Sequence, residues 1–202
     1  MKVVLDACVL YPPVLREILL GVAQAGLMEP VWSARILEEW ARASRKLGPE
    51  AEVMARGAAA ALVAAFPRAM AAAAPGLEVR LHLPDANDIH VLAVAIASSA
   101  DAILTYNAAD FPRHVLAAEG LARRDPDGFL WELWSHQPEA VRGVLEAVLA
   151  RASAMAGVEQ TMQAMLRRLR LNRLAKAVQA VQAGQAGQAG QAVQAGQAGR
   201  AG

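Results

Sequence analysis

The chain opens with an apolar run that ends on a carboxylate, Val3-Val4-Leu5-Asp6. Its valines and leucine predict a buried strand over residues 2–6. A carboxylate at the end of a buried strand is unfavourable unless a positive group lies against it. Further acids flank other apolar segments, and two or three such acids together indicate a shared cation held by oxygen ligands.

Strand-like and helix-like segments alternate through the first part of the chain. Strands are predicted over residues 2–6, 29–32, 102–106 and 120–124, with a further extended segment over 78–83. Helices are predicted over residues 14–24, 34–46, 49–66 and 86–98, with Ser33 and Asp85 as N-caps. This alternation is typical of an α/β fold with a parallel sheet and right-handed crossovers. Ligands of such sheets bind beyond the carboxyl ends of the strands, where Asp6 and Asn107 stand.

The sequence becomes wholly helical after Pro126, with helices predicted over residues 127–135, 138–155 and 158–176. The last of these carries five basic residues: Arg167, Arg168, Arg170, Arg173 and Lys176. Two interpretations remain open, a solvated face of an amphipathic helix, which we favour, and a patch that contacts phosphates. From Gln179 onward, Gln-Ala-Gly and Gln-Ala-Val triplets repeat, and these bury too little apolar surface to fold. We therefore expect an α/β domain over 1–134, a helical extension over 135–176 and a low-complexity disordered tail over 177–202.

The cysteine and histidine residues limit which disulfides and metal sites the chain can form. Cys8 is the only cysteine, which excludes an intramolecular disulfide and favours a reducing, cytoplasmic location. The four histidines lack the pair spacing of a zinc site, so oxygen ligands favour Mg²⁺ or Mn²⁺. No signal peptide or membrane-spanning segment is predicted. The formal net charge of +1 neither requires nor excludes a nucleic-acid partner.

Four motifs, in order along the chain, resemble those of PIN domains, which are metal-dependent nucleases that include the VapC-type toxins of bacterial toxin–antitoxin pairs. The motifs are VLDACVLYP (residues 4–12), ILEEW (36–40), LPDANDIHVLA (83–93) and LTYNAADFP (104–112). The resemblance covers residues 1–130. It implies a PIN-like parallel sheet flanked by helices, followed by the small helical extension.

Three acids match the metal ligands of that family: Asp6, Glu39 and Asp88. The resemblance implies that they bind Mg²⁺ or Mn²⁺ and take part in catalysis. The residues alone leave other interpretations open, a solvent-exposed strand-end acid for Asp6 and helix capping for Asp88. Periodicity does not choose between Glu38 and Glu39, which flank the apolar face of their helix almost symmetrically. The family position selects Glu39.

Asn107 stands where the family usually has its fourth acid. Asp110 follows three residues later and is a further catalytic candidate, while Thr105 matches a strand-end threonine of the family. We expect Thr105 and Asn107 to bind the substrate. The asparagine removes one negative charge and weakens the case for a second metal, but the remaining acids suffice for one.

The resemblance implies a metal-dependent ribonuclease that hydrolyses phosphodiester bonds, and more narrowly the toxin of a type II toxin–antitoxin pair. Its expected partners are an RNA substrate, a cognate antitoxin and a second copy of the chain, with no membrane partner. The departure at Asn107 keeps an alternative open, a PIN-like module that binds RNA or protein without catalysis. A third possibility is a plain α/β binding domain whose acids only cap helices.

Overall fold

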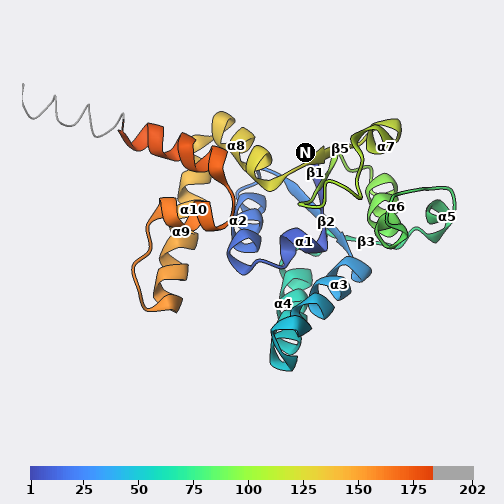
Figure 1. Ribbon diagram of the computed structural model, residues 1–202, viewed down its shortest axis with the longest axis horizontal. Coiled ribbons are helices and arrows are strands. Elements are labelled where there is room, and N and C mark those ends of the chain that lie inside the picture. The colour runs from blue at the N-terminus through green and yellow to red at the C-terminus, as the bar shows by residue number, and fades with distance from the viewer. Residues whose placement is uncertain (184–202) are drawn as a thin grey trace, which may run out of the picture.

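The computed structural model describes residues 1–183. Its centre is a five-stranded sheet in the order β3-β2-β1-β4-β5, in which every strand pair is parallel (Figure 1). The strands are β1 (Lys2–Leu5), β2 (Glu29–Ser33), β3 (Met70–Ala71), β4 (Ala102–Leu104) and β5 (Ala122–Arg124). The predicted α/β class, a parallel sheet with flanking helices, is confirmed.

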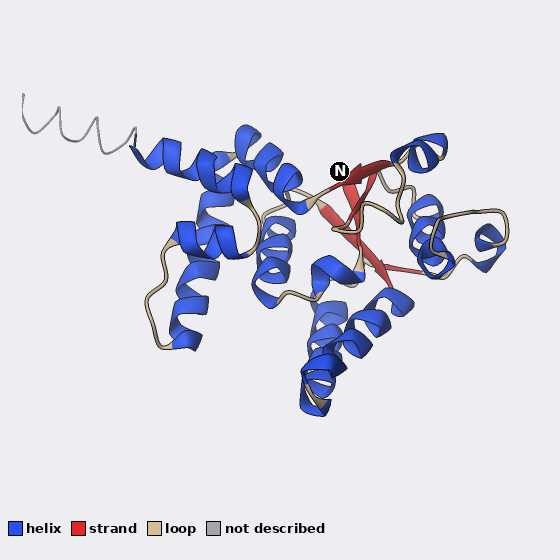
Figure 2. Cartoon of the chain, in the orientation of Figure 1, coloured by secondary structure: helices blue, strands red, loops and turns tan. Residues whose placement is uncertain are grey.

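Helices surround this sheet (Figure 2). In the first part of the chain they are α1 (Ala7–Leu10), α2 (Pro13–Gln24), α3 (Ala34–Ser44), α4 (Pro49–Ala65), α5 (Pro75–Glu78), α6 (Ile89–Ala97) and α7 (Arg113–Ala118). Short 3₁₀ turns, η1 (Arg45–Leu47) and η2 (Ala86–Asp88), follow α3 and precede α6. In Figure 1, α2 lies on one side of the sheet, and α5, α6 and α7 lie on the other.

Local sequence signals account for several of these elements. The Ser33 hydroxyl accepts a hydrogen bond from the backbone N–H of Ile36, and the Asp85 carboxylate accepts one from Asn87, so both predicted caps are confirmed. Beyond Lys2, every residue of β1 is fully buried. That burial is expected of a central parallel strand covered by helices on both faces.

Three short segments differ from the sequence predictions. Residues 78–83 are not an extended segment, because α5 ends at Glu78 and turns follow it, so that prediction was wrong. Strand β3 and helix α1 were not predicted. Two and four residues are too few to show a hydrophobic period, and only the tertiary pairing defines these elements.

The C-terminal part contains α8 (Pro126–His136), α9 (Pro138–Ala156), α10 (Met162–Arg168) and a last helix over residues 172–183. The prediction of a single helix over 158–176 was wrong. The chain turns at residues 169–171, where Arg170 has a φ of 60°. The Asp127 carboxylate then accepts hydrogen bonds from the backbone N–H groups of Arg173 and Leu174 and begins the last helix. The five basic residues therefore lie on two helices and the turn between them.

The last helix also continues past the predicted start of the tail. Its Val178 is only 3% exposed and belongs to the core. The predicted boundary at residue 177 thus lies inside a helix, and residues 177–183 are not part of a disordered tail. The rest of the predicted tail, residues 184–202, lies outside the described residues.

The helical extension packs on the sheet domain through α9 and α2 (Figure 1). Gly21 allows the two helices to approach closely. A Cβ at this position would lie 2.5 Å from Cγ1 of Val144 on α9, nearer than real carbon atoms approach. The contact makes the extension part of one packed body with the α/β domain.

Candidate functional site

Predicted site residues gather at the carboxyl ends of β1 and β4. Asp6 directly follows β1, and its backbone N–H donates a 3.2 Å hydrogen bond to the carbonyl of Leu104 in β4. Thr105 directly follows β4. Asp88 ends η2 just before α6, and Asp110 lies in the loop that follows β4. The parallel sheet thus brings acids from three separate parts of the sequence to one edge.

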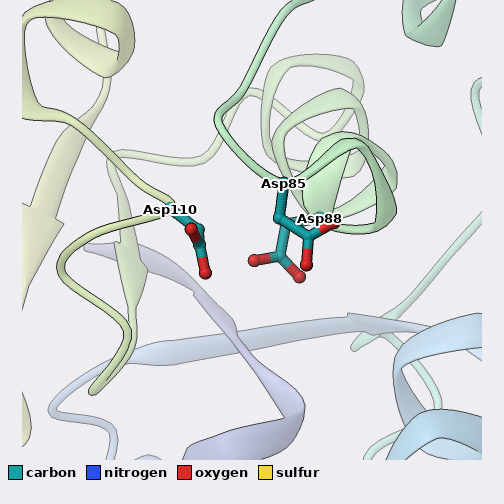
Figure 3. Close-up of side chains that lie close together, drawn as sticks. All are labelled: Asp85, Asp88 and Asp110. Atoms are coloured by element: carbon teal, nitrogen blue, oxygen red, sulfur yellow. The ribbon is translucent and has the colours of Figure 1, made fainter.

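Three carboxylates lie together at this edge, those of Asp85, Asp88 and Asp110 (Figure 3). One oxygen atom from each lies within 4.8 Å of the other two. We call this set the acidic cluster. The sequence predicted Asp85 only as an N-cap. Its Oδ1 does accept a 2.8 Å hydrogen bond from the N–H of Asn87, and its carboxylate also belongs to the cluster.

Asp6 lies outside the acidic cluster and is held by neighbours of its own. Its Oδ2 accepts hydrogen bonds from the Thr105 hydroxyl at 2.6 Å and from the Cys8 thiol at 3.0 Å. The Thr105 hydroxyl also accepts the N–H of Asn107 at 2.9 Å. Thr105 was predicted to bind substrate, and its geometry supports a different task, which is to position Asp6.

Partial burial and the surrounding negative charges raise the pKa of Asp88 above its ordinary value. Partial burial first, and then the charges of Asp6, Asp85, Asp110 and Glu39, raise the pKa of Asp88 to about 6. All three predicted metal ligands and the acidic cluster therefore act on one another electrostatically. A positive ion among them would relieve this repulsion.

Asn107 lies between two acids of the cluster. Its amide nitrogen donates hydrogen bonds to Oδ2 of Asp110 at 2.6 Å and to Oδ2 of Asp88 at 3.2 Å. Its carbonyl oxygen accepts the backbone N–H of Asp110 at 3.3 Å, which supports this orientation of the amide. The asparagine thus links two carboxylates with a neutral group at the position where the PIN motif usually has an acid.

Helix α3 places its two glutamates in different surroundings. Glu38 forms ion pairs with Arg42 at 2.7 Å and with Arg56 at 2.5 Å, and these guanidinium groups lower the pKa of Glu38 to about 2. Glu39 lies toward α6, with its Oε1 2.9 Å from Nε2 of His90. The geometry therefore supports Glu39 as the site residue and gives Glu38 a role in joining α3 to α4.

Two further residues at the site were not predicted, Arg35 and His90. Arg35 donates to Oε1 of Glu39 and to the backbone carbonyl of Asn87, both at 3.2 Å. His90 is 2% exposed, and neither ring nitrogen makes a hydrogen bond, because the close approach to Glu39 lacks hydrogen-bond geometry. Arg35 stands four residues before Glu39, and that helical ion-pair spacing was the available signal. His90 had no signal beyond its place in the third motif.

Cys8 is unsuited to act as a thiolate. Burial first, and then the charge of Asp6 and the hydrogen bond to it, raise the pKa of the Cys8 thiol to about 12. The sulfur also accepts the backbone N–H of Tyr106 at 3.2 Å. At neutral pH this residue is therefore a protonated donor that helps to hold Asp6.

Comparison with models of protein families shows to which family the chain belongs. The PIN domain family model matches residues 2–109, more than half of the chain. The chain belongs to the PIN domain family. The match includes every predicted site residue except Asp110, which lies one position beyond it. No curated protein and no solved structure matches the chain. Among residues 1–183, no helix is long and apolar enough to cross a membrane.

PIN domains are in general metal-dependent nucleases that bind nucleic acids, and the acidic cluster suits that chemistry. Two oxygen atoms bound to one Mg²⁺ lie at most about 4.2 Å apart, which is twice a bond of about 2.1 Å. The cluster's oxygens lie within 4.8 Å, so small side-chain rotations would bring them into range. The donors are all oxygen atoms, which fits a hard divalent cation.

Proposed function

We propose that this PIN domain is a Mg²⁺- or Mn²⁺-dependent endoribonuclease. The observation that carries the proposal is the acidic cluster, with its three carboxylate oxygens within 4.8 Å of one another. Asp6 and Glu39 act on the same cluster through their charges. Such a group of acids destabilises a fold unless a cation offsets the repulsion, so its presence favours a site that binds one.

The residues divide the work of hydrolysis between them. When bound, the ion would supply a Lewis acid for the phosphoryl oxygen and would lower the pKa of a water molecule. Asp88, which belongs both to the acidic cluster and to the predicted ligands, would hold the ion, with Asp85 facing it from the cluster. Asp6 and Glu39, whose charges already act on Asp88, would complete the ligand set, and Thr105 would keep Asp6 in place through its 2.6 Å hydrogen bond. Asp110, on the other side of the cluster from Asp88, would orient the attacking water and take its proton.

Asn107 would contact the substrate beside these acids. In the metal-free protein its amide nitrogen donates both hydrogens to Asp88 and Asp110, so an approaching phosphate would meet a neutral group there and not a fourth negative charge. A cation that drew Asp88 away from the amide would free one N–H to donate to the phosphate. A phosphodiester carries a negative charge, and a donor lowers the cost of bringing it to a carboxylate-rich site. This is the role that we propose for the residue at the family's usual fourth acid.

We further propose that the enzyme is the toxin of a type II toxin–antitoxin pair and that it acts in the cytoplasm. We also propose that it forms a homodimer. The support is the similarity of its four motifs to those of PIN domains, a family that includes the VapC-type toxins. A cognate antitoxin would send an arginine or lysine toward the acids. The 3.2 Å ion pair between Arg35 and Glu39 supports this idea, because it already brings a guanidinium group to an acid of the proposed site.

The second candidate is a PIN domain that binds RNA or a protein without cleaving it. The observation that favours it is Asn107, whose amide hydrogen bonds tie Asp88 to Asp110 without a metal ion. In that case the amide would replace the ion as the group that holds the acids together.

A titration with Mn²⁺, followed by an RNA cleavage assay on the same sample, separates these candidates. Saturable Mn²⁺ binding together with Mn²⁺-dependent cleavage is the expected result. Binding without cleavage would favour the non-catalytic module. The absence of both would contradict a metal site and leave the acids as helix caps and strand-end groups.

A further inference from the structure

A basic hollow of about 570 Å³ lies beside β5, outside the acidic cluster. Residues of α7, β5, α8 and the last helix line it, and four of them are arginines: Arg113, Arg123, Arg124 and Arg173. A second hollow of about 510 Å³ shares Trp131 and Arg173 with the first and adds Lys176. The two together form one surface, which we call the basic groove.

Most of the positive charge in the basic groove is not neutralised by the protein. Two acids also line it, and both are engaged: Asp125 caps α8 by accepting the N–H of Gly128, and Glu132 pairs with Arg124. In the described part of the chain, the side chains of Arg113, Arg173 and Lys176 form no ion pair with a carboxylate. These three side chains are exposed, so the groove presents a positively charged surface to solvent.

Trp131 gives the groove an aromatic surface as well. It is 43% exposed, whereas the other three tryptophans of the chain are buried in the core. An exposed indole is costly in contact with water unless another flat or apolar group covers it. Next to arginine and lysine side chains, it has the composition of a platform on which a nucleic-acid base stacks while its phosphates meet the cations.

The groove is also connected to the candidate catalytic site. Arg123 lines the groove, and its guanidinium donates hydrogen bonds to the carbonyls of Ala108 and Phe111 at 2.6 and 3.0 Å. These two residues flank Asp110 in the loop after β4. A strand held in the groove would therefore pass along the loop that carries an acid of the cluster.

We propose that the basic groove binds a single-stranded segment of RNA outside the acidic cluster, with a base stacked on Trp131 and phosphates held by Arg113, Arg173 and Lys176. The identity of the ligand rests on the proposed ribonuclease function, but binding in the groove does not require the metal. An acidic protein segment would satisfy the cations alone and would make no particular use of the tryptophan face.

The test measures binding of a short oligouridylate to the full chain in EDTA over a series of salt concentrations. The variants are Trp131→Ala, the pair Arg173→Gln with Lys176→Gln, and a control pair, Arg167→Gln with Arg168→Gln. The control changes the same charge at residues that line neither hollow. The Arg173 side chain is not needed for the last helix, because the Asp127 cap binds its backbone N–H.

We expect Trp131→Ala to weaken binding about fivefold or more, as loss of one stacked base predicts. The Arg173/Lys176 pair should reduce the slope of log affinity against log salt by about 1.4, or about 0.7 per lost phosphate contact. The control pair should keep the parent slope. Oligouridylate should also quench tryptophan emission in the parent but not in Trp131→Ala, because the other tryptophans are buried.

The proposal is overturned if Trp131→Ala binds as tightly as the parent, or if the two charge pairs change the slope equally. Polyglutamate that binds as tightly as oligouridylate would assign the groove to an acidic protein and overturn it too. Binding that depends on Trp131 in a chain that never cleaves RNA would support the groove and contradict only the ribonuclease. If the parent cleaves RNA but its groove variants bind oligouridylate as tightly as the parent does, the ribonuclease is supported and the groove proposal is contradicted.

Discussion

The hydroxyl of Thr105 donates a 2.6 Å hydrogen bond to Oδ2 of Asp6, across 99 positions of sequence. The bond joins the ends of β4 and β1, two neighbouring strands of the sheet. Both residues are buried, so the bond is shielded from competing water. The orientation of one predicted metal ligand thus depends on a neutral side chain from another strand.

Thr105→Val removes this donor while keeping the shape of the side chain. We expect it to fold and to lose about 10- to 100-fold in Mn²⁺-dependent RNA cleavage, the usual cost of losing a partner that orients a metal ligand. Thr105→Ser keeps the hydroxyl and should retain most of the activity. The measurement is the cleavage rate over a Mn²⁺ series, and equal rates for the valine and serine variants would contradict the positioning role.

The raised pKa of Asp88 makes the stability of the metal-free protein depend on pH. Its folded-state pKa is about 6, above the ordinary value near 4. As the pH falls from 6 toward 4, the folded protein takes up this proton before the unfolded chain does. The free energy of unfolding should therefore rise through this window and be lowest above pH 6.

Asp88→Asn removes that dependence. In EDTA at pH 7 the variant should be at least as stable as the parent, with a gain of up to about 1 kcal/mol, since solvent screens this only partly buried group. Urea unfolding at pH 7 and pH 5 provides the measurement. A parent whose stability falls between pH 7 and pH 5 in step with the variant would show that Asp88 is not the titrating group.

Glu39→Gln should damage RNA cleavage far more than Glu38→Gln. Glu39 lies beside His90 and adds to the field at Asp88, whereas Glu38 is committed to Arg42 and Arg56. The two substitutions are chemically identical and adjacent, so each is the control for the other. Equal activities, or a larger loss in Glu38→Gln, would show that α3 contributes the other glutamate to the site.

The sheet and its helices were largely predictable because their signals are local. The valines of β1, the cap at Ser33 and the apolar length of α6 each specify one element without reference to the rest of the chain. The break at residues 169–171 was not predictable in this way. Helical propensity runs through it, and the deciding contact is the carboxylate of Asp127, more than 40 residues earlier.

The candidate site was predictable in its residue types but not in its geometry. Motif positions gave Asp88 and Asp110, and the structure places their oxygens in the acidic cluster. Asp85 joins them although its sequence context indicates only a cap, because one carboxylate can bind a backbone N–H and face its neighbours at once. For the groove around Trp131 the sequence offered only the basic residues Arg173 and Lys176, because the groove forms only where residues 113–132 meet the last helix, about 40 residues later.

The packing of the extension on the domain can be tested with two glycines. Gly21→Ala would place a methyl group against Val144, and we expect a loss of about 1 kcal/mol in the free energy of unfolding after the gain in helix propensity is counted. Gly57→Ala in α4 meets no atom within 4 Å and should be stabilising by about the same amount. Urea unfolding of both variants measures the difference.

A second substitution, in the residue that the Gly21→Ala methyl group would meet, tests the same contact from the other helix. Val144→Ala removes the methyl groups that the new side chain would meet, so it should restore part of the stability lost in Gly21→Ala. If Gly21→Ala and Gly57→Ala change the stability alike, α9 does not hold α2 as closely as the structure shows.

The most direct test of the central claim is the rate of Mn²⁺-dependent RNA cleavage by the parent, Asp6→Asn and Asp88→Asn, with Glu146→Gln as a control. Glu146 is an exposed residue of α9, so the control changes one charge away from the site. We expect both aspartate variants to fold and to lose about a hundredfold or more of the activity, because each isostere removes a charge that holds the ion. The control should cleave like the parent. Full activity in either aspartate variant would contradict the assignment of the metal-dependent ribonuclease site.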